Sequence, residues 1–245
     1  MKALVCISHV PDTTTKIQID GSGTDINRQS VSFVYDPNAE YALSRAVELK
    51  EAGKIQTLIV ACVGGADVEP TLRKALAVGA DAGVRLDAPS RDPYVIAHNL
   101  AAYARTQSFD LVLFGKESSA TNDSAVPAMV AELLDLPLLN FVSALEIEGT
   151  TLKVLTEVEG GEERYECPTP AAISAQKGIA EWKIPNMRGI MAARTKKIDV
   201  IPASGAAPRV TVQQMTLPPA KSGIKMIDPA NLDELVTVLA DKGVI

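Results

Sequence analysis

Apolar positions in the first half of the chain follow two alternating patterns. Short continuous apolar runs predict buried strands, and runs with apolar residues three or four positions apart predict amphipathic helices. The expected strands are 3–8, 55–65 and 110–115, and the expected helices are 36–54, 67–79, 92–107 and 125–137. Two helices begin with Asp-Pro, at Asp36 and Asp92, which puts a capping side chain and a proline where helix starts favour them.

Strands that alternate with helices predict an α/β fold with a doubly wound, mostly parallel, Rossmann-like sheet. Such sheets bind ligands at the carboxyl ends of their strands, where the strand order reverses. The expected ends are Cys6–Ser8, Cys62–Gly65 and Phe114–Lys116. We therefore expect a ligand site where these ends meet.

The pattern changes after about residue 138. Segments 152–158, 160–167 and 170–176 predict short strands around a Gly-Gly turn. A linker at 202–208 and a final helix at 228–243 follow. We expect an α/β domain over 1–200, with a hairpin and a helical segment at 182–197, and a C-terminal helical arm over 201–245. Sequence alone allows the last helix to pack on its own domain or on a partner.

The stretch PNMRGIMAARTKK, residues 185–197, differs from the other helices. As a helix it places Met187, Ile190 and Met191 on one face, with Gly189 in the middle and a basic end. A mid-helix glycine costs about 1 kcal/mol relative to alanine, which is tolerable if a partner supplies packing. The segment either packs within the protein or binds a partner molecule.

Composition narrows the classes of function. The 245 residues are 47% hydrophobic and 22% charged, with a net charge of −6, which argues against nucleic acid as a partner. Aromatic residues make up only 4%, too few for a surface of stacked bases or sugars. No apolar run is long enough to span a membrane, and the apolar part of MKALVCISHVPD is too short for a signal peptide. We expect a soluble, cytoplasmic protein without membrane insertion.

Metal and catalytic signatures are missing from the sequence. Cys6, Cys62 and Cys167 are odd in number and widely spaced, which indicates buried free thiols. His9 and His98 have no partner at metal-ligand spacing, and we interpret them as polar loop or helix-surface residues. There is no G-x-G-x-x-G, Walker A, G-x-S-x-G or H-E-x-x-H motif. We therefore identify no catalytic residue and no metal ligand.

The loop FGKESSATNDSAVPAM, residues 114–129, is the strongest candidate site. It joins a buried strand to a helix whose start offers free N–H groups and a positive dipole end to a phosphate. Lys116 and the loop hydroxyls can add contacts. The alternative is a polar loop in which Asn122, Asp123 or Ser124 only caps the helix. Its place at the carboxyl edge of the sheet favours nucleotide binding.

Six segments of the chain match one family in order. They are HVPDTTTKIQID (9–20), DPNAEYALSRAVELKE (36–51), TLRKALAVGAD (71–81), LVLFGKES (111–118), VEGGEERYECPTPAAISAQ (158–176) and IPNMRGIMAARTKK (184–197). Over nearly its whole length, the chain thus resembles the beta subunit of electron transfer flavoprotein.

The resemblance implies a heterodimer in which an alpha subunit carries most of the FAD site and the beta subunit binds a structural AMP. In bifurcating members a second FAD takes the place of AMP. Electrons pass from acyl-CoA or related dehydrogenases to the flavin and on to a quinone oxidoreductase, so the beta subunit is a carrier and not an independent enzyme. The arm would pack on the alpha subunit, in a prokaryotic cytoplasm or an organelle matrix.

The resemblance also implies nucleotide contacts at each strand end. These are Cys6, Asp36, Pro37, Asn38, Ala39, Val63, Gly115, Lys116, Glu117, Ser118, Ser119, Ala120, Thr121, Asn122, Asp123, Ser124, Ala125 and Val126. The loop departs from the family pattern at 117–120, where Gln-Ala-Ile-Asp is usual, and at 125–127. AMP, FAD and an empty site therefore stay open as alternatives.

Partner contacts follow from the same resemblance. The implied docking residues are Ile184, Met187, Arg188, Ile190 and Met191, with Glu157 facing the flavin domain and Thr13 near the flavin. We expect Met187 to anchor in the dehydrogenase, because methionine adapts to pockets of different shape. We expect Ile190 and Met191 to pack on the protein's own sheet. Glu157 can also be a plain solvated carboxylate.

Two other classes compete with this interpretation. A homodimeric, stress-protein-like nucleotide-binding regulatory module would share the α/β part but would not explain the chain after residue 138. A stand-alone α/β enzyme would need a catalytic constellation that the sequence lacks.

Overall fold

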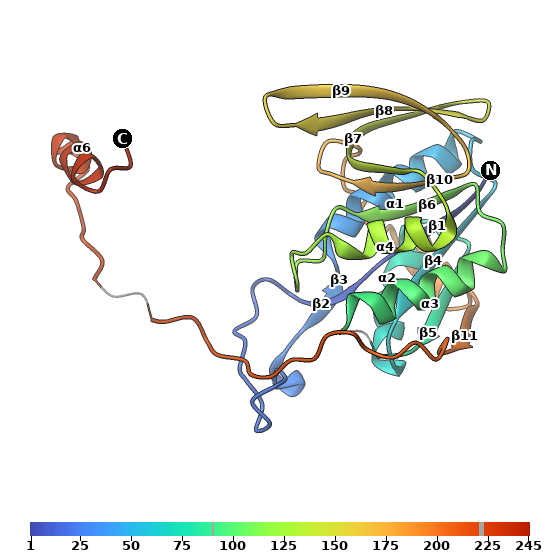
Figure 1. Cartoon of the computed structure of the whole chain (residues 1–245), viewed down its shortest axis with the longest axis horizontal. Coiled ribbons are helices and arrows are strands. Elements are labelled where there is room, and N and C mark those ends of the chain that lie inside the picture. The colour runs from blue at the N-terminus through green and yellow to red at the C-terminus, as the bar shows by residue number, and fades with distance from the viewer. Residues whose placement is uncertain (90, 221–222) are drawn as a thin grey trace.

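The computed structural model describes residues 1–89, 91–220 and 223–245 of the chain. Within these residues, nine strands form one sheet in the order β11-β5-β4-β1-β6-β10-β7-β8-β9 (Figure 1). The strands are β1 (Lys2–Cys6), β4 (Thr57–Val63), β5 (Ala82–Asp87), β6 (Leu111–Gly115), β7 (Leu138–Glu148), β8 (Thr151–Val158), β9 (Gly161–Pro168), β10 (Ala171–Ala175) and β11 (Ile198–Pro202). The predicted α/β fold is confirmed.

The strands from β11 to β7 run parallel, and β8 and β9 extend the sheet as antiparallel strands. In the central strand β1, consecutive residues Ala3, Leu4 and Val5 are all fully buried. Helices cover both faces of this part of the sheet, so no position along the strand faces water and the apolar run is continuous.

Four helices form the two covering layers. Helices α1 (Pro37–Glu51) and α2 (Glu69–Val78) pack on one face, and α3 (Pro93–Arg105) and α4 (Ala125–Leu134) pack on the other (Figure 1). Both Asp-Pro starts are confirmed. The backbone N–H of Asn38 donates to Asp36 at 2.7 Å, and that of Val95 donates to Asp92 at 3.0 Å.

The strand order reverses at β1. The chain moves from β1 to β4 and β5 on one side, and α3 then returns it to β6 on the other side of β1. The last residues of β1, β4 and β6 are Cys6, Val63 and Gly115. Their ends therefore flank the crevice that such sheets use for ligands.

A small second sheet lies beside this crevice. Strands β2 (His9–Pro11) and β3 (Phe33–Tyr35) pair antiparallel and enclose a long loop with the short helix η1 (Arg28–Ser30). A second short helix, η2 (Ala66–Val68), joins β4 to α2. This sheet projects the loop 12–32 along the open edge of the domain.

Helix α5 (Met187–Ala193) is shorter than the predicted segment and packs against α2. Gly189 lies so close to α2 that a Cβ at this position would be 2.2 Å from the carbonyl oxygen of Ala77. The glycine is thus required by a contact within the chain, and a partner is not needed to explain it.

The expectation that Ile190 and Met191 pack on the protein's own sheet is wrong. They are 40% and 55% exposed. The contact with α2 runs through the small residues Gly189 and Ala193 instead, and the larger apolar side chains are left outside.

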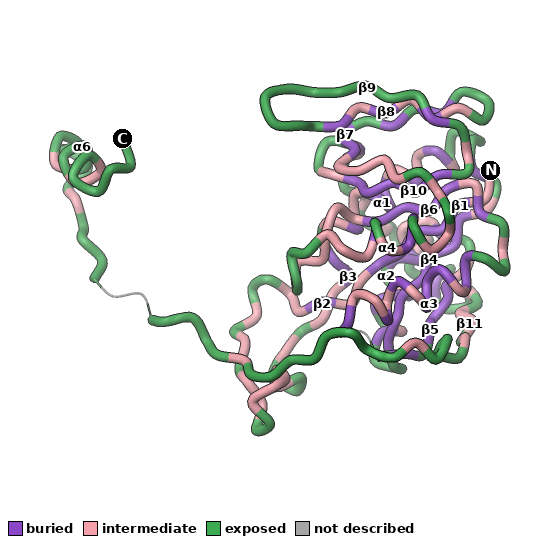
Figure 2. Tube along the Cα trace, in the orientation of Figure 1, coloured by how far each residue is buried: buried purple, intermediate pink, exposed green. Residues whose placement is uncertain are grey.

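The C-terminal segment is first held on the domain and then leaves it. Backbone N–H groups of Ser204, Arg209 and Met215 donate to Asn99 Oδ1 (2.8 Å), Asp92 Oδ2 (2.7 Å) and Gly23 O (2.8 Å). Helix α6 (Leu232–Asp241) has no buried residue, and it lies away from the sheet (Figures 1 and 2). Within the described residues, hydrogen bonds therefore hold the segment on the domain as far as Met215. None of the helices in the described ranges is long and apolar enough to cross a membrane.

Candidate functional site

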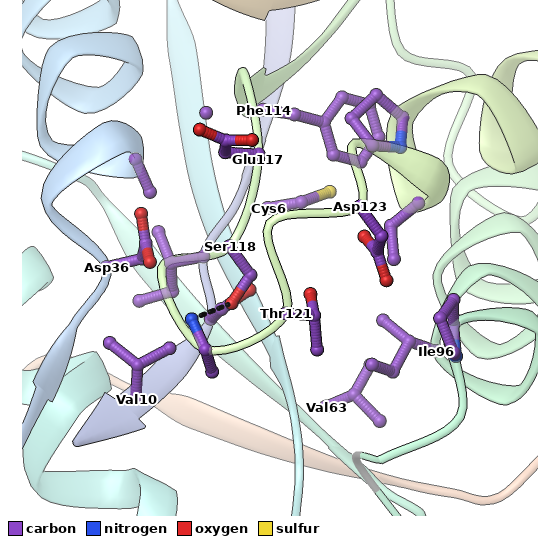
Figure 3. Close-up of a pocket in the computed structure, with 18 of the residues that line it drawn as sticks. Cys6, Val10, Asp36, Val63, Ile96, Phe114, Glu117, Ser118, Thr121 and Asp123 are labelled. Carbon is purple, nitrogen blue, oxygen red and sulfur yellow. Dashed lines mark hydrogen bonds between the residues drawn. The ribbon is translucent and has the colours of Figure 1, made fainter. Parts of the chain in front are cut away.

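A cleft opens at the carboxyl edge of the sheet, as the strand ends predicted (Figure 3). Its empty volume is about 860 Å³, counted out to the solvent at its mouth. Among the residues that the sequence predicted as nucleotide contacts, those that line it are Cys6, Asp36, Ala39, Val63, Gly115, Glu117, Ser118, Ala120, Thr121, Asp123, Ser124 and Val126. The three strand ends and the loop thus converge on one space.

The other predicted contacts do not line the cleft: Pro37, Asn38, Lys116, Ser119, Asn122 and Ala125. Several of them shape the loop. The Asn38 side chain donates to the carbonyl of Glu117 at 3.2 Å, and the N–H of Lys116 donates to Ala175 O at 2.9 Å. Their role in this structure is to hold the wall in place.

Ten more residues line the cleft: Ile7, Ser8, His9, Val10, Arg91, Pro93, Ile96, Leu100, Phe114 and Pro127. Ile7, Ser8 and Phe114 belong to the predicted strand ends and Pro127 to the predicted loop, but sequence analysis missed the others. Pro93, Ile96 and Leu100 belong to α3, and Arg91 directly precedes its N-cap. The Asp-Pro motif had located this helix start, but not its neighbourhood in space.

Asp36 joins the two sides of the site. It is 1% exposed, and its carboxylate accepts hydrogen bonds from the N–H groups of Asn38 (2.7 Å) and Ser119 (2.6 Å). One side chain therefore caps α1 and fixes the loop across from it. Burial, with the Asp36 charge as a second cause, raises the pKa of nearby Glu40 to about 7.

Gly115 permits the close contact between β6 and α1. A Cβ there would lie 2.6 Å from both Ala39 N and the carbonyl carbon of Asn38. No side chain can occupy this position without moving the start of α1, so the geometry of the cleft depends on glycine.

At the start of α4 the structure shows which residue occupies the N-cap position. Ser124 holds the N-cap position with left-handed backbone (φ 49°), and its side chain makes no capping hydrogen bond. Asp123 accepts from the N–H of Ala125 at 3.2 Å. The hydroxyls of Ser118 and Thr121 belong to the same loop (Figure 3). The loop thus combines a helix start with hydroxyl groups at the cleft.

The cleft carries charges of both signs. The lining carboxylates are those of Asp36, Glu117 and Asp123, and Glu117 lies 3.3 Å from the Lys116 ammonium. The lining cations are the Arg91 guanidinium and, when protonated, the His9 imidazole. Figure 3 shows Asp36 and Ser118 on the α1 side and Asp123 with Ile96 on the opposite side.

His9 is not the polar loop residue that we expected. It belongs to β2, stacks on Phe33 with ring centroids 4.5 Å apart, and its Nδ1 lies 2.7 Å from the Thr71 hydroxyl. Burial lowers the pKa of the imidazole, and the Asp67 carboxylate only partly offsets this effect. The ring is therefore neutral at pH 7 and serves as part of the wall.

The predicted docking residues form an exposed apolar surface. Ile184 and Met187 are 74% and 73% exposed, and Met191, Ile190 and Arg188 are exposed beside them. The sole tryptophan, Trp182, is also half exposed at this surface. We call Trp182, Ile184, Met187, Ile190 and Met191 the docking surface. The position of a lone tryptophan next to the segment was a signal that sequence analysis left unused.

Two further predicted residues lie apart from this surface. Glu157 is exposed at the end of β8 and accepts a hydrogen bond from the Gln176 side chain. Thr13 is exposed in the loop after β2. Both are accessible to a partner chain.

The cysteines are buried, as predicted, and are unpaired within the described residues. Burial raises the pKa of Cys62 to about 12 and that of Cys6 further still, so both thiols stay protonated. No group of three or more His, Cys, Asp or Glu side chains that could hold a metal ion occurs in the described part of the chain.

Comparison with known proteins identifies the family. Residues 24–206 match the family profile described as "Electron transfer flavoprotein domain". The electron transfer flavoprotein subunit beta of Syntrophomonas wolfei subsp. wolfei is 35% identical over 231 residues, covering 93% of this chain and 90% of that protein. The subunit beta of Bacillus subtilis is 32% identical over 253 residues (98% and 97% covered). That of Bos taurus is 31% identical over 253 residues (99% and 98%). The chain belongs to the electron transfer flavoprotein family, within its beta subunits.

Proposed function

We propose that this chain is the beta subunit of a heterodimeric electron carrier that takes electrons from acyl-CoA or related dehydrogenases and passes them to a quinone oxidoreductase. The FAD that carries the electrons is held mainly by the alpha subunit, and the cleft of this chain binds a structural AMP. The single observation that supports this best is an exposed apolar docking surface on a domain that also has a cleft at the carboxyl edge of its sheet.

Family membership alone supports the general part of this proposal, which is electron transfer through a flavin by a two-subunit protein. Electron transfer flavoproteins carry electrons with a flavin, and a beta subunit has an alpha subunit as its partner. The further details are our proposal, including a cytoplasmic or organelle-matrix location.

The residues of the cleft fit a nucleotide. The cleft lies at the carboxyl ends of β1, β4 and β6, where doubly wound sheets bind their ligands. Val10, Val63 and Ile96 offer apolar surface for a base, and Ser118 and Thr121 offer hydroxyls. The start of α4 and its dipole favour a phosphate. Asp36 is held by two backbone N–H groups and contributes to a rigid wall.

The docking surface suits a transient partner. Burial of one anchor such as Met187 is worth roughly 1.5–3 kcal/mol, which permits a specific grip with rapid release. We predict that Met187→Ala lowers the second-order rate of electron transfer from the dehydrogenase about 10-fold or more. Bound flavin should be unchanged.

The measurement is stopped-flow reduction of the purified heterodimer by its dehydrogenase. Val200→Ala is the matched control, since Val200 is a half-exposed apolar residue on the edge strand β11. Equal transfer rates for the wild type and Met187→Ala would refute the docking role.

The first test of the whole proposal is a count of small molecules released from the purified heterodimer by denaturation. One FAD and one AMP per heterodimer would support the proposal. Two FAD would indicate a bifurcating protein, and one FAD alone would mean that the cleft has lost its ligand. A homodimer without flavin would favour the regulatory module instead.

A further inference from the structure

Among the described residues that line the cleft, Arg91 is the one cationic side chain, because the His9 imidazole is neutral. It directly precedes Asp92, the N-cap of α3, and its side chain is 43% exposed. It was not among the residues that the sequence or the family resemblance singled out. Its place at the cleft therefore calls for a physical explanation.

The start of α3 forms the more positive end of the cleft. Pro93 and Ile96 from the first turns of α3, and Val126 and Pro127 from the first turns of α4, line the same space. Helix N-termini carry partial positive charge, and Arg91 adds a full one. Asp123 contributes one opposing negative charge at this end, and its carboxylate accepts a hydrogen bond from the N–H of Ala125.

The other end of the cleft is unsuited to an anion. It carries the buried carboxylate of Asp36 and the carboxylate of Glu117, which the Lys116 ammonium balances from 3.3 Å. A nucleoside monophosphate has an uncharged base and sugar at one end and a dianionic phosphate at the other. Electrostatics therefore orients such a ligand with its phosphate toward α3 and α4.

Arg91 has a partner in this structure. It forms an ion pair with Asp25 and donates to the carbonyl oxygen of Thr24 at 2.9 Å. Both acceptors lie in the loop between β2 and β3, beside the mouth of the cleft. A guanidinium has five N–H donors. A phosphate can therefore bind the Arg91 guanidinium either in place of Asp25 or together with it.

We propose that Arg91 is the cationic contact for the phosphate group of the nucleotide in the cleft, and that Asp25 competes for it. This inference rests on the proposed nucleotide site and adds a residue and an orientation to it. Arg91 thereby selects nucleoside phosphates over nucleosides.

The test compares AMP with adenosine in heterodimers stripped of nucleotide, by calorimetric titration of the wild type, Arg91→Gln and Asp25→Asn. We expect Arg91→Gln to weaken AMP about 10- to 100-fold, as for loss of a charge-assisted hydrogen bond, and to leave adenosine unchanged. Asp25→Asn, which removes the same ion pair but keeps the cation, should retain or tighten AMP binding.

Four outcomes would overturn the inference. Unchanged AMP affinity in Arg91→Gln would exclude the contact. Equal weakening of AMP and adenosine, or a matching loss in Asp25→Asn, would show that the ion pair only shapes the loop. Wild-type protein that binds neither ligand would instead refute the nucleotide site itself, and this inference with it.

Discussion

At Gly115 the end of β6 meets the first turn of α1 at a distance that only glycine allows. We predict that Gly115→Ala pushes these elements apart, destabilises the domain by about 1–3 kcal/mol and lowers the AMP content of the heterodimer. Denaturant unfolding and nucleotide counting measure the two effects. Gly161→Ala is the matched control, because a Cβ at Gly161 meets nothing within 4 Å. Full AMP occupancy in Gly115→Ala would argue against the close contact.

Glu40 gives the protein a specific pH dependence. Its pKa is raised from 4.5 to about 7 by burial and by Asp36. The folded state therefore holds the proton more tightly than the unfolded state, and stability falls as the pH rises from 4.5 through 7. Above pH 7 the ionised Glu40 carboxylate therefore lowers the free energy of unfolding.

We predict that Glu40→Gln removes this cost. At pH 8 the melting temperature should rise by about 2–4 °C, the shift that corresponds to about 1 kcal/mol in a chain of this size. At pH 4 the variant and wild type should melt alike. Calorimetry at the two pH values provides the measurement, and a rise of the same size at pH 4 would contradict the electrostatic explanation.

Among the elements, α5 lies on α2 through Gly189, Ala193 and a hydrogen bond from the Arg73 side chain to Ala193 O (2.8 Å). We predict that Gly189→Ala, whose Cβ would meet Ala77 O, displaces α5 and slows electron transfer from the dehydrogenase without loss of FAD. The fluorescence of Trp182, five residues before the first residue of α5, should report the displacement. Ala192→Ser, at an exposed position of the same helix, is the control. Normal transfer kinetics in Gly189→Ala would mean that docking tolerates a moved helix.

Elements with strong local signals could be predicted from sequence, and others could not. The Asp-Pro starts of α1 and α3 and the apolar runs of β1 and β6 are local features. Strand β5 was missed because Gly83 and Arg85 interrupt its apolar run, yet both fit a strand: Gly83 faces Ile198 and Leu76, and Arg85 pairs with Glu69 and Asp87. Strands β7 and β11 were missed as well.

In the site, too, residues with local sequence signals were predicted and residues placed by distant packing were not. The strand ends and the loop 117–126 were predictable, since parallel strands bring their carboxyl ends to one edge. Arg91 and Ile96 were not, because their place at the cleft depends on which side of β1 receives β6. That choice is set by packing of distant segments and leaves no mark in the local sequence.

On the scale of the whole molecule, α6 has no buried residue. A ten-residue helix is marginal alone in water, and Leu232, Leu235 and Val236 of α6 are exposed. Burial of one leucine or valine is worth roughly 1.5–3 kcal/mol. Burial of this face therefore stabilises the helix, and the alpha subunit is the partner that we propose to cover it.

We predict that deletion of residues 216–245 abolishes co-purification with the alpha subunit but leaves the α/β domain folded. The cut falls after the hydrogen bond from Met215 N to Gly23 O, which in the described ranges is the last to hold the segment on the domain. The truncated chain therefore keeps these contacts. Light scattering should give a monomer, and circular dichroism should keep the helix and strand signals.

Leu235→Ala in the full chain should weaken the heterodimer by about 10-fold or more, whereas Thr237→Ser on the same helix should not. A truncated chain that still forms a one-to-one complex with the alpha subunit would show that the domain surface, and not the arm, holds the partner.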